Sequence, residues 1–238
     1  MLAHRTVPLV SALAGDRRHE ALLLDFGGVC LLNPVELHRR TETLLGLGPG
    51  TLEWRGPLEP ATDALWQRMV VGDGVTERDY WAQRATEIGQ AAGRVFSVRD
   101  YMDLLYDPPF DEMIRPAAVD VVERARAAGL GVSILTNDMR AFHGATWESG
   151  VRFFDLVDHI VDCSDTGCLK PDPRAFQRAI DTIGIEPARV LFVDDQPANV
   201  DGGIRFGLDA VWFDIANADG AWRSVAERLG LDRRAQPV

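Results

Sequence analysis

The sequence contains little cysteine and histidine, and it lacks the metal-binding spacings of either. Its three cysteines, Cys30, Cys163 and Cys168, include no Cys-x-x-Cys pair, and its five histidines include no His-x-x-x-His pair. A disulfide framework and a zinc site are therefore not expected. Unpatterned cysteines of this kind are typical of a reducing compartment, so we expect a cytoplasmic protein.

Long hydrophobic runs are also absent, because no segment approaches the ~20 apolar residues of a membrane span. The longest apolar stretch near the start, residues 7–15, is short, contains Pro8 and is followed by charged residues. Residues 1–19 are therefore expected to be a loosely held N-terminal extension rather than a signal peptide or a membrane anchor.

Basic charge is scarce as well, since 25 Lys and Arg residues face 36 Asp and Glu residues, a formal net charge of −11. A nucleic-acid-binding surface requires clustered basic residues, so this class of partner is not expected. A local site can still bind a small anion against the overall field. The sequence does not distinguish a monomer from a homodimer.

What the sequence does contain is a series of short apolar runs separated by helical patterns. The runs cover residues 21–26, 131–137, 159–164, 190–195 and 209–214. Each is apolar at successive rather than alternate positions, which is typical of strands buried on both faces of a parallel sheet. The helical patterns between the later runs, at residues 117–129, 173–184 and 198–207, end at glycines suited to helix C-termini. The predicted fold class is α/β, with a Rossmann-like parallel sheet core and helices on both faces.

The first predicted strand is followed by a long stretch, residues 33–107, with helical patterns and no strand-like run. Thr76 and Asp79 have the spacing of a capping box at the start of one of these helices. The sequence Asp-Pro-Pro at 107–109 then breaks the chain before it returns to the sheet. We predict an N-terminal extension, an α/β core and a small all-helical cap, at residues 1–19, 20–32 with 108–238, and 33–107, respectively.

Polar residues follow three of the predicted strands at their carboxyl ends. These residues are Asp25, Thr136, Asn137, Asp194 and Asp195. Lys170 precedes a proline-containing turn into a predicted helix. Ligands of open parallel sheets bind beyond the carboxyl ends of the strands. One acid at a strand end often only caps the next helix, but three polar strand ends and a lysine together indicate a ligand site.

The charges of these residues predict a metal ion. Asp25, Asp194 and Asp195 carry three negative charges against the one positive charge of Lys170, a sum of minus two. A dianionic phosphate should not enter such a site, whereas one divalent cation would bring the sum to zero. Carboxylate oxygens of this kind suit Mg²⁺.

Four segments resemble, in order, the signature motifs of the haloacid dehalogenase (HAD) superfamily of hydrolases. They are LLLDFGGV, ILTND, LKPDPRAF and VLFVDDQPANVDGG. The resemblance covers roughly residues 20–215, and the helical insert is similar to the cap that these enzymes place after strand one. The segment GDGVTERDYWAQ resembles the cap of the branch that holds glucose-1-phosphate phosphatase-like and epoxide-hydrolase N-domain-like members.

The resemblance implies a hydrolase in which Asp25 attacks phosphorus and forms an aspartyl-phosphate that water then hydrolyses. The resemblance also assigns catalytic roles to Lys170 and Thr136. The residues that the resemblance assigns to phosphate binding are Thr136, Asn137, Lys170 and Gly28. Those that it assigns to Mg²⁺ are Asp25, Gly27 through its carbonyl, Asp194 and Asp195. The implied substrate is a small phosphorylated metabolite, such as a sugar phosphate.

Gly27 departs from the motif, because most phosphatases of the superfamily carry a second aspartate there, which protonates the leaving oxygen. Three consequences are open: a substrate whose leaving group needs little protonation, another residue that supplies the proton, or a protein that binds phosphate esters and turns them over poorly. A structural explanation is that the tight turn after strand one requires a residue without Cβ.

Two alternatives to a phosphatase remain. The first is a weakly catalytic, phospho-ligand-binding regulatory protein, which Gly27 supports. The second is dehalogenase-type attack on carbon, which needs no metal; the paired acids Asp194 and Asp195 favour the phosphatase over it. The substrate itself is not specified by the sequence.

Several further residues are candidates for the cleft. An aromatic and arginine set in the predicted cap could contact a sugar or form the cap's own core; it comprises Trp54, Arg55, Trp66, Tyr80 and Trp81. Arg115 lies near the hinge and could reach the cleft or cap a helix. Asp138 is predicted to be a helix N-cap rather than a catalytic acid.

Overall fold

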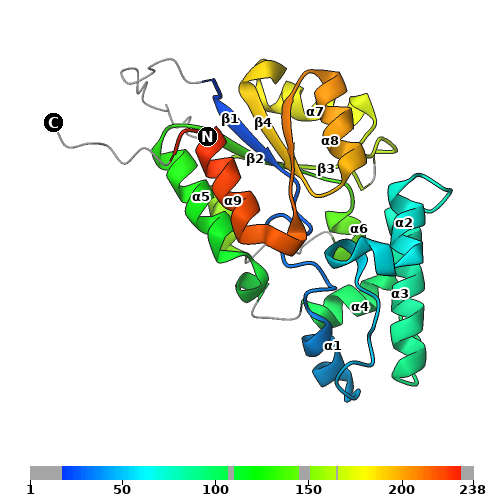
Figure 1. Ribbon diagram of the computed structural model, residues 1–238. Helices are drawn as coiled ribbons and strands as arrows, with labels where there is room; N and C mark the ends of the chain where they lie inside the picture. The colour runs from blue at the N-terminus through cyan, green and yellow to red at the C-terminus, as the bar shows by residue number, and fades with distance from the viewer. Residues whose placement is uncertain (1–17, 107–109, 145–150, 165, 232–238) are drawn as a thin grey trace, which may run out of the picture.

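A computed structural model describes residues 18–106, 110–144, 151–164 and 166–231 (Figure 1). Its centre is a sheet of five strands in the order β3-β2-β1-β4-β5, and every neighbouring pair is parallel. The strands are β1 (Ala21–Leu24), β2 (Gly131–Thr136), β3 (His159–Asp162), β4 (Val190–Asp194) and β5 (Asp209–Trp212). The predicted α/β fold class is confirmed, and each predicted run contains a strand.

Helices cover both faces of this sheet (Figure 1). Leu22 and Leu24 of β1 belong to a core shared with α5 and α9, whereas Ala21 and Leu23 belong to a second core shared with α7. The continuous apolar run of β1 follows from this arrangement, because successive side chains point to opposite faces and both faces are buried. The helices of these layers are α5 (Pro116–Ala127), α7 (Pro173–Ile183), α8 (Pro197–Phe206) and α9 (Ala218–Arg228).

Residues 33–106, the helical insert, form no strand and lie beyond the carboxyl ends of the sheet strands (Figure 1). The predicted capping box is present, because the Thr76 hydroxyl accepts from the backbone of Asp79 while the Asp79 side chain accepts from the backbone of Thr76. The insert's helices are α1 (His38–Leu45), α2 (Ala64–Val70), α3 (Glu77–Ala91) and α4 (Val98–Leu105), with short turns η1 (Gly56–Leu58) and η2 (Pro60–Thr62). Helix α4 contacts the short core helix α6 (Met139–His143). The predicted chain break at 107–109 falls outside the described residues.

The expected extension at residues 1–19 is too long by at least one residue. His19 is buried, and its Nε2 lies 2.7 Å from Asp209 Oδ2 at the start of β5. Residue 19 is therefore part of the core, while residues 1–17 lie outside the described part. All three cysteines are free thiols, and none of the described helices has the length and hydrophobicity that crossing a membrane requires.

Candidate active site

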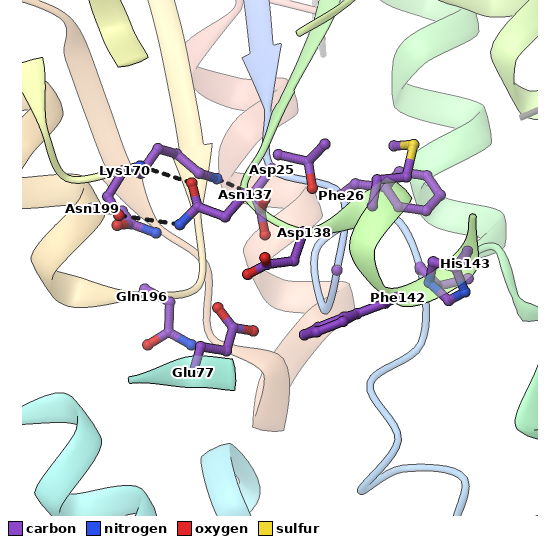
Figure 2. Close-up of a pocket in the computed structure, with 14 residues that line it drawn as sticks. Asp25, Phe26, Glu77, Asn137, Asp138, Phe142, His143, Lys170, Gln196 and Asn199 are labelled. Carbon is purple, nitrogen blue, oxygen red and sulfur yellow. Dashed lines mark hydrogen bonds and ion pairs between the residues drawn. The ribbon is translucent and has the colours of Figure 1, made fainter. Parts of the chain in front are cut away.

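Asp25 stands at the carboxyl end of the central strand. Its backbone N–H donates to the Val193 carbonyl at 2.8 Å, which continues the pairing of β1 with β4 by one residue. The Lys170 ammonium donates to Asp25 Oδ1 and to Asp194 Oδ2, both at 2.7 Å. Figure 2 shows this lysine reaching toward Asp25 from the loop before α7. Side chains from three distant segments of the chain therefore meet at one sheet edge, as predicted.

Asn137 positions the lysine loop. Its side-chain oxygen accepts from the backbone N–H of Lys170 at 2.7 Å, and its side-chain NH₂ donates to the Lys170 carbonyl at 3.1 Å (Figure 2). This two-way pairing satisfies the amide of Asn137 and fixes the end of β2 against the loop. Because the side chain is occupied in this way, the backbone of Asn137 is the part that stays predicted to bind phosphate. Thr136, buried at the end of β2, lines the same pocket as Asp25 and Lys170.

The three acids Asp25, Asp194 and Asp195 come together, with one ligand oxygen from each within 4.8 Å of the others. Asp194 is fully buried and accepts hydrogen bonds from the Asn199 side chain at 3.0 Å and from the Gln196 backbone at 2.8 Å. The Asp195 carboxylate, also buried, receives no hydrogen bond from a described residue. Among the described residues, Lys170 is the cation that acts on the Asp195 charge, and this lysine is already paired with Asp25 and Asp194.

The pKa values of the cluster follow from its charges, three carboxylates beside one lysine. Burial raises the pKa of Asp25 to about 6, against the opposing effect of Lys170. Burial and the charges of Asp25 and Asp194 raise the pKa of Asp195 well above its usual range. Burial alone would lower the pKa of Lys170, but Asp194 and Asp25 outweigh it and raise that pKa. Such a cluster is stabilised by protons or by a divalent cation, so the carboxylates of Asp25, Asp194 and Asp195 fit Mg²⁺. The predicted Gly27 carbonyl ligand stays a prediction.

The two glycines after Asp25 have different structural roles. Gly28 has φ +77°, and a Cβ there would lie 2.8 Å from Ile215 Cδ1 and 3.1 Å from Asp195 Oδ2, so glycine is required. Gly27 is outside the left-handed region, and a Cβ there would meet nothing within 4 Å. The steric explanation for Gly27 is therefore wrong. No clash at Cβ therefore requires glycine at this position.

Arg115 holds the loop after β1 and is not among the residues that line the pocket around Asp25. Its Nε donates to the Gly28 carbonyl at 3.0 Å, and its two terminal nitrogens bind the Glu36 carboxylate at 2.9 and 2.5 Å. The arginine is buried and immediately precedes α5. It thus joins the loop after β1 to the first turn of the helical insert, and its side chain does not cap a helix.

The helical insert reaches the core through the start of α3. The Arg78 guanidinium forms an ion pair with Asp138 at 2.5 Å and donates to the Ser164 carbonyl at 3.2 Å. Asp138 occupies the N-cap position of α6, as predicted, but its side chain makes no capping hydrogen bond and pairs with Arg78 instead. Glu77, the residue before Arg78, is half-buried and lines the pocket with Asp25. Burial, with the charges of Asp138 and Asp25, raises the pKa of Glu77 to about 8.

The aromatic set of the insert forms the insert's own core. Tyr80 and Trp81 are buried with their rings 4.9 Å apart, and Trp66 packs edge-on against Tyr80 at 5.2 Å. Asp63, buried beneath them, accepts from the Tyr80 hydroxyl and pairs with Arg84. The pocket around Asp25 is lined by none of the five candidates Trp54, Arg55, Trp66, Tyr80 and Trp81. The explanation as cap core holds for the four aromatic residues, whereas Arg55 is partly exposed and pairs with Glu59.

Comparison with known proteins assigns the family. A family model for haloacid dehalogenase-like hydrolases matches residues 19–207. The chain belongs to this hydrolase family. The structure of the putative HAD-hydrolase YfnB from Bacillus subtilis, described as bound to magnesium, shares the fold, with a TM-score of 0.60 at 20% identity over 83% of this chain and 87% of that one.

Two curated relatives of this HAD-like hydrolase are named for different activities. Phosphatase MT3486 of Mycobacterium tuberculosis is 32% identical over 131 residues, which cover 55% of this chain and 57% of that protein. (S)-2-haloacid dehalogenase 1 of Pseudomonas sp. is 28% identical over 149 residues, which cover 61% and 63%. The chain spans less than two thirds of the length of the first relatives it matches. Hydrolase chemistry is thus common to both, while the bond that is cleaved differs between them.

Sequence reasoning missed four residues of this HAD-like site. Asn199 and Gln196 hold Asp194, and Glu77 and Arg78 bring the insert to the pocket. Asn199 could have been found, because it lies one helical turn after the paired acids and faces back toward them. Nothing local in the sequence indicates that Glu77 faces Asp25, since that depends on how the insert packs on the core.

Proposed function

We propose that this protein is a Mg²⁺-dependent phosphatase that acts on a small phosphorylated metabolite through an aspartyl-phosphate on Asp25. The observation that carries the proposal is the buried triad Asp25, Asp194 and Asp195, whose three carboxylates share a single cation, Lys170. A divalent ion would balance these charges and leave the site able to accept a phosphate dianion. The named phosphatase among the relatives supports the same reaction.

Each residue of the chain has a defined part in this reaction. Asp25 Oδ attacks phosphorus, and Lys170 beside it neutralises charge on the nucleophile and on the transferring group. Thr136 and the backbone around Asn137 and Gly28 donate to the phosphoryl oxygens. The Mg²⁺, when bound, supplies positive charge at the phosphoryl oxygens. Asn199 and Gln196 fix the orientation of Asp194 for this purpose.

Dehalogenase chemistry is the second candidate, and the haloacid dehalogenase relative favours it. In that reaction Asp25 would attack carbon and displace halide without a metal. The buried carboxylate of Asp195, which no described residue hydrogen-bonds, argues against it, because nothing in such a reaction requires a third acid at that place. A phospho-ligand-binding protein without turnover is the third candidate, supported by Gly27.

A substrate screen separates these candidates. We expect the purified chain to release inorganic phosphate from members of a panel of phosphorylated metabolites, with at least a ~10²-fold dependence on Mg²⁺ that EDTA abolishes. Halide release from 2-chloropropionate, assayed in parallel without metal, should be absent. Metal-independent turnover at full rate contradicts the proposal, and ligand-dependent thermal stabilisation without any turnover would favour the binding protein.

The open space at Gly27 allows a gain-of-function test. Gly27→Asp is expected to raise kcat/KM for phosphate esters of poor leaving groups, because a carboxyl group there can protonate the leaving oxygen. The gain should be largest in a protein that lacks another proton donor, since general acid catalysis contributes ~10²–10⁴-fold. Gly27→Asn has nearly the same volume without the proton and is the matched control. Equal effects of the two substitutions would show that the position does not take part in proton transfer.

A further inference from the structure

The pocket around Asp25 contains an acid that the proposed mechanism has not used. The acids that line it are Asp25, Glu77 and Asp138. Asp138 is engaged in the ion pair with Arg78, and Asp25 is the nucleophile. Glu77 forms no ion pair with a described lysine or arginine, and its one hydrogen bond is from Trp81 Nε1 at 3.4 Å. It is the acid of this pocket that remains available.

Glu77 approaches from the side opposite the nucleophile. It is the one residue of the helical insert that lines the pocket, while Asp25 approaches from the end of β1. Figure 2 shows its carboxylate directed from the start of α3 into the space beneath Asp138. In an in-line displacement at phosphorus, the leaving oxygen lies opposite the attacking oxygen. The leaving oxygen of a bound ester would therefore emerge toward the insert.

The local structure holds Glu77 at this place. Thr76 and Asp79 complete the capping box of α3, so the Glu77 carboxylate is not needed to cap the helix. Arg78 ties the same turn to the core through Asp138 and the Ser164 carbonyl. Trp81, one turn further along α3, donates a hydrogen bond from its Nε1 to the Glu77 carboxylate. These contacts order a carboxyl group in the pocket that Gly27 also lines, where residue 27 itself supplies no acid.

We propose that Glu77 is the proton donor and acceptor of the reaction and replaces the acid that is missing at Gly27. This inference rests on the proposed phosphatase function. As Asp25 Oδ bonds to phosphorus and the P–O bond to the leaving group breaks, the Glu77 carboxyl gives its proton to that leaving oxygen. The Glu77 carboxylate then takes a proton from water as the water oxygen bonds to phosphorus and the Asp25–phosphorus bond breaks. The products are the alcohol and inorganic phosphate, and Glu77 is protonated again.

The groups that face Glu77 are compatible with this role. The charges of Asp138 and Asp25 favour its protonated form, while the charge of Lys170 opposes them. A half-buried carboxyl group with a raised pKa carries a proton at neutral pH in a fraction large enough to act as an acid. The Trp81 contact is a weak one, so the carboxylate is not locked away from the pocket.

The test compares two aryl phosphates, p-nitrophenyl phosphate and phenyl phosphate, which differ in how much their leaving oxygen needs a proton. Glu77→Gln should lower kcat/KM for phenyl phosphate by ~10²-fold or more and for p-nitrophenyl phosphate by less than ~10-fold. It should also trap the aspartyl-phosphate, which acid quenching and mass spectrometry of the Asp25 peptide would detect. Gly27→Asp in the Glu77→Gln background should restore phenyl phosphate hydrolysis, whereas Gly27→Asn should not.

Control variants separate this inference from the proposed function. Glu87→Gln makes the same change on the same helix, where Glu87 pairs with Arg84 away from the pocket, and should leave the ratio of the two substrates unchanged. Glu77→Asp, which keeps the acid, should retain more activity than Glu77→Gln. An equal loss of kcat/KM on both substrates, or no loss, overturns the role of Glu77 while the phosphatase stands. A wild-type chain inactive on every phosphate ester overturns the phosphatase, and the role of Glu77 falls with it.

Discussion

Asp25→Asn is expected to lower phosphate release by at least ~10⁴-fold while the protein remains folded. The amide of asparagine is a poor nucleophile, and loss of the attacking group of a covalent mechanism removes nearly all of the rate. The fold should tolerate the change, because Lys170 keeps its ion pair with Asp194. Burial raises the pKa of Asp25 to about 6, so its charge at neutral pH opposes folding. The thermal unfolding midpoint at pH 7 should therefore stay the same or rise.

The measurement is phosphate release from the best substrate of the screen, beside thermal unfolding of both proteins. Asp120→Asn, which changes an exposed aspartate on α5, is the matched control and should keep full activity. Wild-type protein quenched in turnover should carry a phosphoryl group on the peptide that contains Asp25. An active Asp25→Asn protein, or a label on another residue, would contradict the assignment of the nucleophile.

Asp194→Asn is expected to abolish Mg²⁺ binding and, with it, activity. Asp194 is fully buried and already receives hydrogen bonds from Lys170, Asn199 and the Gln196 backbone. Replacing one carboxylate oxygen by an NH₂ group removes a metal ligand and places a donor against these donors. In the wild-type protein, Mg²⁺ at 100 times its Kd should stabilise the fold by about 2.7 kcal/mol, since it binds the native state alone.

Titration calorimetry and thermal unfolding with and without Mg²⁺ measure this difference. The rise in unfolding midpoint that Mg²⁺ gives the wild-type protein should disappear in Asp194→Asn. Asp201→Asn, an exposed change on α8 seven residues further along the chain, should keep the rise. If Asp194→Asn still binds Mg²⁺ with unchanged affinity, the triad is not the metal site.

The fold and half of the site could be predicted because their determinants are local. A strand buried on both faces must be apolar at successive positions, and this holds for the central strands β1, β2 and β4. The edge strands β3 and β5 were found from the same pattern although they are partly exposed. Asp25, Thr136 and Asp194 follow or end such strands, and the carboxyl ends of parallel strands meet at one edge. Their convergence, with Lys170 between two of the acids, is what the structure shows.

The interpretation of single residues was less successful where it depended on neighbours in space. A tight turn was one explanation for Gly27, yet a Cβ there would meet no atom within 4 Å, and Gly28 is the glycine that the turn requires. Asp138 has the sequence position of a helix cap but pairs with Arg78, a residue of the helical insert. In both cases the local sequence pattern was compatible with two structural roles. The packing of Ile215 against Gly28 decided the first case, and the packing of the helical insert against Asp138 decided the second.

The sequence by itself determined the α/β sheet, the helical insert and the cluster of three acids and one lysine at the strand ends. Side-chain periodicity and strand direction fix these features whatever the insert does. Only the tertiary structure decided that Glu77 enters the pocket opposite Asp25, that Asn137 holds the lysine loop and that the insert's aromatic residues pack on one another. These contacts join segments far apart in the chain, so they depend on how those segments pack against one another. A local sequence pattern does not encode that packing.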